Sequence, residues 1–259
     1  MKVIHADARD VRLADLGEAF APGADLLLSE LLGSFGDNEL SPDIIDTVLS
    51  NGLLHSVHGI SIPSAYTSYI APLYAPALHS AARQFLPGDS SSKSLEQLYV
   101  VHMTNVDVLA EARPLFHFEH RGGNSSNGDG NKYRTVTFSK EDIAQKCSSS
   151  TASGSVEVTG LHTSFECTLY KDVTFSTVPE THSVGMSSWF PGYLPLRIPL
   201  VVSLHNNGLV SVSVWRRVDK QRLWYEWCVA ISGAAHGSGG GAVVTEMSNA
   251  NGRSYFVGK

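Results

Sequence analysis

Two acidic residues, Glu30 and Glu39, flank a short segment that carries glycines at positions 33 and 36. Glycine permits tight turns because it adopts positive φ without steric cost, so we expect both carboxylates to converge on one point. A guanidinium is the cation that fits two converging acids best, since it is planar, permanently charged and offers paired donors. The pattern therefore predicts a clamp for an arginine side chain. An acidic loop that only caps the following helix is the structural alternative.

The residues around this segment indicate how it is positioned. Asp25–Ser29 is short, apolar and followed by turn residues, which predicts a fully buried strand of a parallel sheet. Glu30 then stands at the carboxyl end of that strand, the edge where open α/β sheets bind ligands. A helix is predicted over Pro42–Leu49, with Ser41 as its cap. A further inner strand is predicted at Val3–His5.

The sequence pattern changes near Gly59, where short strands separated by polar or glycine-rich turns begin. Valines alternate with serines over 210–214, which is the two-residue period of a strand with one buried face. A mainly antiparallel β-barrel or β-sandwich is therefore predicted after an α/β segment. Further strands are predicted over Gln97–Val101, Arg134–Phe138, Phe165–Tyr170 and Leu223–Ile231.

One helix is predicted within this β-rich part, because apolar residues recur there at steps of three and four. On the spacing alone, a helix that packs on its own barrel explains this stripe. The stripe consists of Tyr74, Ala77, Leu78, Ala81, Ala82 and Phe85.

Two groups of aromatic residues differ in their context. Trp189 and Phe190 lie among prolines and glycines on a predicted loop, which favours a binding surface over the alternative of core packing. Trp224, Tyr225 and Trp227 follow one another along a predicted strand, so they occupy both of its faces. Core and interface packing is the prediction for this second group.

Composition excludes several classes of protein. The chain has 259 residues, a formal net charge of −6 and a pI near 6.0, which argues against a protein that binds a nucleic-acid backbone. An acidic chain suits basic, arginine-rich peptides. No stretch reaches the roughly 18 apolar residues of a membrane span, and the start does not resemble a signal peptide. The three cysteines, Cys147, Cys167 and Cys228, are widely spaced and predict free thiols in a reducing compartment.

Metal and nucleotide motifs are weak in this sequence. His117 and His120 are three apart on a predicted strand and point to opposite faces, so no metal site is predicted. Gly237–Gly241 matches a dinucleotide glycine pattern, but the following Val-Val-Thr is a poor helix start. A surface loop is the prediction for these glycines.

Several motifs follow one another along the chain in a characteristic order. They begin with Ser29–Pro42 around the two acids and continue with Gly59–Pro63, Tyr66–Ser68, Pro179–Ser183, Gly185–Met186, Ser188–Pro191, Trp224–Trp227 and Asn251–Tyr255. Together they resemble the protein arginine methyltransferase 5 family, the type II enzymes that dimethylate arginine symmetrically. The motif over Ser29–Pro42 resembles the double-glutamate loop of that family.

The resemblance implies roles for individual residues. Glu30 and Glu39 correspond to the catalytic acids, while Ser188, Trp189 and Phe190 correspond to the loop that contacts the substrate. Asp7 corresponds to the acid that meets the adenine amino group of S-adenosylmethionine, although a helix-capping role is the alternative. Ala8 replaces the methionine that follows this acid in the family. Thr181 and His182 match a family loop by motif, with a structural histidine hydrogen bond as the alternative.

The resemblance also implies a domain organisation. Residues 1–60 are expected to be the C-terminal part of a Rossmann-like S-adenosylmethionine-dependent domain, and residues 61–259 a β-barrel with a helical dimerisation arm for substrate binding and oligomerisation. The triosephosphate-isomerase-type barrel and the first half of the donor domain, including the glycine turn that holds the donor, are expected to be missing.

Activity and partners follow from the same resemblance. The expected reaction is methyl transfer to arginine in Gly/Arg-rich substrates such as histone tails and RNA-binding or spliceosomal proteins, in cytoplasm and nucleus, without a metal. A homo-oligomer is expected, and the WD-repeat partner of the family only for a full-length protein. A catalytically silent substrate-binding or dimerisation fragment is the alternative.

Overall fold

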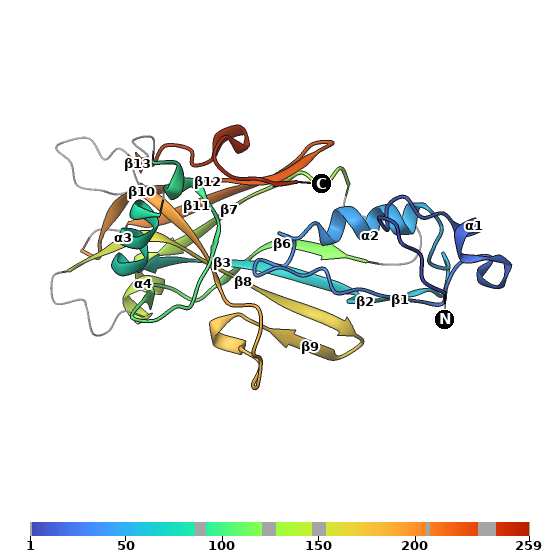
Figure 1. Ribbon diagram of the computed structural model, residues 1–259. Helices are drawn as coiled ribbons and strands as arrows, with labels where there is room; N and C mark the ends of the chain where they lie inside the picture. The colour runs from blue at the N-terminus through green and yellow to red at the C-terminus, as the bar shows by residue number, and fades with distance from the viewer. Residues whose placement is uncertain are drawn as a thin grey trace.

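The computed structural model describes residues 2–85, 92–120, 128–146, 154–205, 208–232 and 242–258. A small α/β segment lies at one end of the molecule, near the N-terminus, and two larger antiparallel sheets form the rest (Figure 1). The helices α3 and α4 lie at the end of the sheets that is remote from the α/β segment (Figure 1).

The α/β segment contains a two-stranded parallel sheet, as predicted from the run Asp25–Ser29. The expectation of full burial is wrong, because Leu26 and Leu28 are 52% and 72% exposed. Leu27 faces the other way and packs beside α2. A parallel strand is buried on both sides only when elements cover both faces of its sheet, and here one face lacks such a cover among the described residues. The elements are α1 (Leu13–Leu16), η1 (Glu18–Phe20), β1 (Leu26–Leu28), α2 (Ser41–Ser50) and β2 (Ile60–Ile62).

Two further expectations for this segment are corrected. Val3–His5 is not a strand, and Val3 is 78% exposed. An apolar run this short becomes a strand only beside a partner, and in the described chain β1 pairs with β2 alone. The cap of α2 is Leu40, in a left-handed conformation with φ 67°, and Ser41 is the first helical residue. Asp43 lies in the first turn of the helix.

The larger sheet has seven strands and is built around β8, which pairs with β3, β9 and β10. The predicted strand Phe165–Tyr170 is confirmed as part of β8, whereas only Tyr99–Val100 of the predicted Gln97–Val101 forms a strand. The strands are β3 (Ala65–Tyr74), β4 (Tyr99–Val100), β5 (Asp107–Val108), β6 (Arg113–Glu119), β8 (Ser155–Tyr170), β9 (Val173–Ser176) and β10 (Gly192–Ser203), and η2 (Lys93–Glu96) and η4 (Pro179–Thr181) lie in its connections.

The second sheet has five strands, with β11 between β7 and β12. Val210, Val212 and Val214 are fully buried, as their alternation with serines predicts. The predicted strands Arg134–Phe138 and Leu223–Ile231 are confirmed as parts of this sheet. Its elements are β7 (Lys132–Ser139), β11 (Leu209–Val218), β12 (Arg222–Ser232), β13 (Val243–Val244) and β14 (Val257–Gly258), with α4 (Lys140–Lys146) after β7 and η5 (Ala250–Gly252) before β14.

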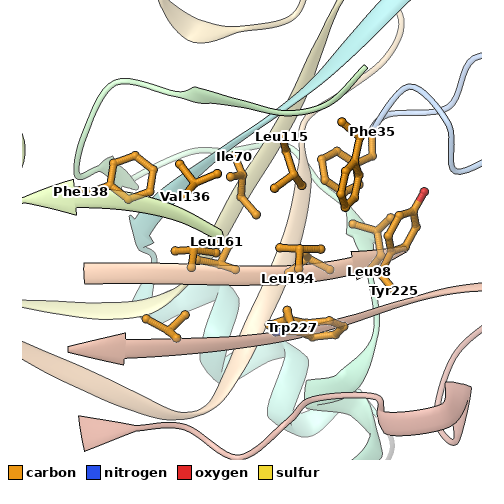
Figure 2. Packing of buried hydrophobic residues seen from close by; sticks show 14 of the residues in the cluster. Phe35, Ile70, Leu98, Leu115, Val136, Phe138, Leu161, Leu194, Tyr225 and Trp227 are labelled. Atoms are coloured by element: carbon orange, nitrogen blue, oxygen red, sulfur yellow. The ribbon is translucent and has the colours of Figure 1, made fainter. Parts of the chain in front are cut away.

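The main core lies between the two sheets. Figure 2 shows Ile70, Leu161 and Leu194 of the larger sheet beside Val136 and Trp227 of the smaller one. Phe35, from the turn between the two acids, inserts into the same core next to Tyr225, with ring centroids 5.3 Å apart. Two sheets that face each other across a core correspond to the β-sandwich, one of the two predicted architectures. Strand pairings in the described residues do not join the sheets into a closed barrel, so the barrel form is not confirmed.

The predicted amphipathic helix is α3 (Pro76–Gln84). Leu78 and Ala82 of the stripe pack against an apolar cluster under the helix. Ala77, Ala81 and Phe85 face outward and are exposed. One side of α3 therefore packs on its own domain, while the rest of the stripe stays available at the surface.

Two expectations from composition can be compared with the structure. Cys167 and Cys228 are free thiols, as predicted, and Cys147 lies outside the described residues. Gly237–Gly241 also lies outside them. In the ranges that are described, no helix has the length and apolar character needed to cross a bilayer.

Two valines, one on a strand of each sheet, test which faces of the sheets form the core. Val212 is fully buried, whereas Val201 is 63% exposed. We expect Val212→Ala to lower the free energy of unfolding by about 2 kcal/mol, because it removes buried methyl groups and leaves a cavity. Val201→Ala should change it by less than about 0.5 kcal/mol. Equal losses in urea denaturation would contradict the assignment of the core.

Candidate functional site

The turn between Glu30 and Glu39 is held by its own backbone and by one side chain. Gly33 and Gly36 exchange backbone hydrogen bonds of 3.2 and 2.8 Å. Gly36 has φ +84°, and a Cβ at Gly33 would lie 2.5 Å from the side chain of Asn38. The Asn38 amide oxygen in turn accepts a hydrogen bond of 2.6 Å from the Phe35 backbone N–H. Both glycines are therefore required by the geometry of the turn.

A groove of about 470 Å³ contains both acidic residues. Glu30 follows shortly after β1, and Glu39 precedes α2, so the turn brings the two ends of the segment to the same groove. The predicted substrate-contact loop reaches this groove as well. Its lining consists of Glu30, Leu32, Ser34, Glu39, Val100, Ser188, Trp189 and Phe190.

The two carboxylates influence each other electrostatically. Partial burial and, next, the negative charge of Glu30 raise the pKa of Glu39 above its usual value. Two like charges in one groove disfavour the ionised state of each other unless a cation lies between them. The groove therefore favours a ligand with a delocalised positive charge.

Trp189 lines the groove and also packs on the core, so it combines the binding role predicted from the sequence with the alternative of core packing. Its indole stacks on Phe175, with ring centroids 5.1 Å apart, and its Nε1–H donates a hydrogen bond of 2.7 Å to the Leu32 carbonyl. The residue has φ +57°, which is rare for a large side chain. Trp189 therefore packs on the core and ties its own loop to the acidic turn. Phe190 is 41% exposed, and its ring centroid lies 3.9 Å from that of His102.

Asp7 and Ala8 lie on the surface and are not among the residues that line the groove. The Asp7 carboxylate accepts hydrogen bonds from the backbone N–H of Arg9 and from the Arg9 guanidinium, and the shortest of them is 2.6 Å long. These side-chain and backbone bonds lower the pKa of Asp7 to about 2. Asp7 is thus already paired within the chain, and these contacts do not form a donor pocket. The adenine-binding role of Asp7 stays a prediction.

Thr181 and His182 also lie outside the groove lining. The Thr181 hydroxyl is 2.8 Å from the Ser176 hydroxyl. His182 Nδ1 lies 3.0 Å from the Ser183 carbonyl oxygen. These contacts stabilise the local turn, which corresponds to the structural alternative for this histidine.

The histidines on and beside β6 occupy different environments. His117 is exposed, and its Nδ1 lies 2.8 Å from the Thr67 hydroxyl. His120 is buried, and burial followed by the nearby His117 lowers its pKa to about 4. Within the described residues, no group of three or more histidine, cysteine or acidic side chains is arranged to hold a metal ion.

Sequence reasoning missed one charged cluster behind the groove. Arg216 is fully buried and forms ion pairs of 2.6 Å with both Asp37 and Asp43. A signal was present in the sequence, because the two-residue period of Val210, Val212 and Val214 places position 216 on the same inward face. A charged residue at such a position predicts a buried ion pair.

Relatives of the chain come from animals, plants and fungi. The chain is 35% identical to protein arginine N-methyltransferase 5 of Xenopus laevis, over 94% of this chain and 34% of that protein. It is 36% identical to protein arginine N-methyltransferase skb1 of Schizosaccharomyces pombe, over 89% of this chain and 36% of that protein. The chain therefore spans about a third of the length of these relatives.

Solved structures with the same fold are more distant in sequence. Protein arginine methyltransferase 10 of Arabidopsis thaliana superimposes with a TM-score of 0.63 at 12% identity, over 98% of this chain and 74% of that one. The Trypanosoma brucei PRMT1 enzyme-prozyme heterotetramer with AdoHcy gives a TM-score of 0.62 at 11% identity, over 94% of this chain and 72% of that one. At these identities the likeness concerns the fold alone.

Two protein-family models match almost the whole chain. The PRMT5 arginine-N-methyltransferase family matches residues 1–62. The PRMT5 oligomerisation domain matches residues 65–257. Together with the relatives, these matches establish that the chain belongs to the protein arginine methyltransferase 5 family.

Proposed function

We propose that this chain supplies the arginine-binding part of a protein arginine methyltransferase, with Glu30 and Glu39 as the acids that hold the guanidinium. The observation that carries the proposal is that both acids line one groove, where partial burial and then the charge of Glu30 raise the pKa of Glu39. Ser188, Trp189 and Phe190 form another wall of this groove and would contact the substrate. Membership of the family supports the same reading.

The chemistry of the reaction explains why two acids are needed. A guanidinium nitrogen would attack the methyl group of a sulfonium donor, so two cations must approach each other. As the carbon–nitrogen bond forms, the carbon–sulfur bond breaks, a neutral thioether leaves and the nitrogen loses a proton. Glu30 and Glu39 would offset this repulsion and orient the attacking nitrogen. The raised pKa of Glu39 suits this carboxylate to accept the proton that the nitrogen loses.

The proposed methyl donor is S-adenosylmethionine, in line with the AdoHcy in the trypanosome relative. Asp7 and Ala8 are the only positions of this chain that we assign to it, by family resemblance. The proposed substrates are Gly/Arg-rich segments of histones and RNA-binding proteins, whose positive charge complements the net charge of −6. Symmetric dimethylation is proposed from the resemblance to the family.

The organisation proposed for the chain has two parts. Residues 1–60 would belong to a methyltransferase domain and residues 61–259 to a substrate-binding and oligomerisation domain, close to the limits of the two family matches. Exposed Ala77, Ala81 and Phe85 on α3 are the surface that we propose for contact with a second copy. A WD-repeat partner is proposed only for the full-length protein.

A second candidate function is a substrate-binding and oligomerisation module without methyltransferase activity. The pairing of Asp7 with Arg9 favours it, because a donor would have to compete for that carboxylate. Calorimetric titration of the chain with S-adenosylmethionine separates the two functions. Heat of binding supports the enzyme, and its absence supports the module.

The interaction between the two acids can be measured directly. We expect Glu30→Gln to lower the pKa of Glu39 towards its usual value, because the substitution removes a nearby negative charge. Carbon-detected NMR titration of the Glu39 carboxyl group is the measurement. Glu141→Gln, on an exposed carboxylate of α4, is the matched control and should leave the pKa unchanged. An unaltered Glu39 pKa in the Glu30 variant would show that the acids do not converge.

Peptide binding tests the proposed ligand. The chain should bind a Gly/Arg-rich peptide more tightly than the same peptide with lysines, because only a guanidinium offers paired donors to two carboxylates. Glu30→Gln and Glu39→Gln should each weaken arginine-peptide binding roughly ten- to hundredfold, the effect of losing a charged hydrogen-bond partner. Glu141→Gln again serves as control in calorimetry. Equal affinity for the two peptides would refute the guanidinium assignment.

A further inference from the structure

The turn that carries the two acids is tied to the second sheet at its centre. Asp37, two residues before Glu39, is fully buried although it is charged. Its Oδ2 accepts hydrogen bonds from Arg216 Nε at 2.6 Å and from the Tyr225 hydroxyl at 2.7 Å. Arg216 lies on β11 and Tyr225 on β12, so both donors belong to the oligomerisation domain.

A third donor reaches the turn from the larger sheet. The Ser68 hydroxyl on β3 lies 2.8 Å from the Phe35 carbonyl oxygen and 3.2 Å from Asp37 Oδ1. Phe35 itself packs against Tyr225 in the core. Both sheets therefore hold the same short stretch of the turn.

The guanidinium of Arg216 uses all three of its nitrogens in this arrangement. Besides Asp37, it donates to Asp43 Oδ2 on α2 and to the Gly130 carbonyl, each at 2.6 Å. Burial alone would lower the pKa of Arg216, but Asp37, then Tyr225 and Asp43, outweigh burial and raise it. A buried charge is tolerated only with such complete compensation, so each partner must keep its place.

The two acids are thus fixed from two directions. Near Glu30, the Trp189 indole holds the Leu32 carbonyl. Near Glu39, Arg216 and Tyr225 hold Asp37. These anchors restrain the backbone of the turn at positions 32 and 37, two residues inside each acid.

We propose that Arg216 and Tyr225 are positioning residues for the arginine groove: through Asp37 they set the separation of Glu30 and Glu39, so the oligomerisation domain controls arginine recognition. The groove lining does not include either residue, so both would act through the turn. The inference rests on the proposed function for the identity of the ligand. The placement of the acids can be tested independently of any ligand.

Tyr225→Phe is the informative substitution, because it removes one hydrogen bond to Asp37 and keeps the buried ring. Tyr193→Phe is the matched control, since Tyr193 is equally buried but lies in another apolar cluster and donates to the Thr159 carbonyl. Both variants are compared with the unaltered chain by three measurements. These are the NMR pKa of Glu39, the Kd for a Gly/Arg-rich peptide and the urea midpoint of unfolding.

The proposal predicts that Tyr225→Phe lets the acids separate, so the Glu39 pKa falls towards its usual value and peptide binding weakens roughly three- to tenfold. Tyr193→Phe should leave both quantities unchanged, even if its urea midpoint falls equally. An unchanged Glu39 pKa in Tyr225→Phe, or an equal change in both variants, overturns the proposal. If the unaltered chain binds no arginine peptide, the proposed function fails, but the Glu39 pKa comparison still decides the positioning role.

A second pair of variants applies if Tyr225→Phe does not fold. Ser68→Ala removes the donor to Phe35 and Asp37 from the opposite side of the turn. Ser164→Ala is its control, because Ser164 is equally buried and its hydroxyl has no hydrogen-bond partner among the described residues. A lower Glu39 pKa in Ser68→Ala alone supports the positioning role. Equal values in the two serine variants reject it.

Discussion

The buried guanidinium of Arg216 is the constraint on which the groove depends. Transfer of a charge from water into the core is costly unless its partners compensate it fully, and here Asp37, Asp43 and the Gly130 carbonyl do so. These partners come from the acidic turn, from α2 and from the residues just before β7. Arg216 therefore links the acidic turn and α2 to the second sheet through one compensated charge.

The groove is open to solvent, while the turn that connects its two acids is anchored in the core. Asp37 and Phe35 are buried in the core, while Glu30 and Glu39 at either end of the turn remain accessible to solvent. Rigid placement matters because two carboxylates that are free to move would relax apart and lose their joint hold on a guanidinium. The raised pKa of Glu39 reflects the partial burial and the repulsion that this placement maintains.

Local patterns predicted most of the fold and the main elements of the site. The alternation over Val210–Val214 predicted the buried face of β11, and the glycines at 33 and 36 predicted the tight turn. The strand at Val3–His5 and the burial of β1 were predicted wrongly, because both depend on neighbouring elements that a local pattern does not contain. The groove walls Leu32, Ser34 and Val100 have no pattern of their own, so sequence analysis did not find them.

The amino-acid sequence alone determined the family resemblance, the two acids, the turn between them and several strands of the sandwich, because these depend on residue type and short-range spacing. Only the tertiary structure decided that both acids line one groove with Trp189 and Phe190, and that Asp37 and Arg216 form a buried pair. Asp37 and Arg216 lie far apart in the chain. Such a contact follows from the packing of whole sheets against each other and from the need to compensate a buried charge.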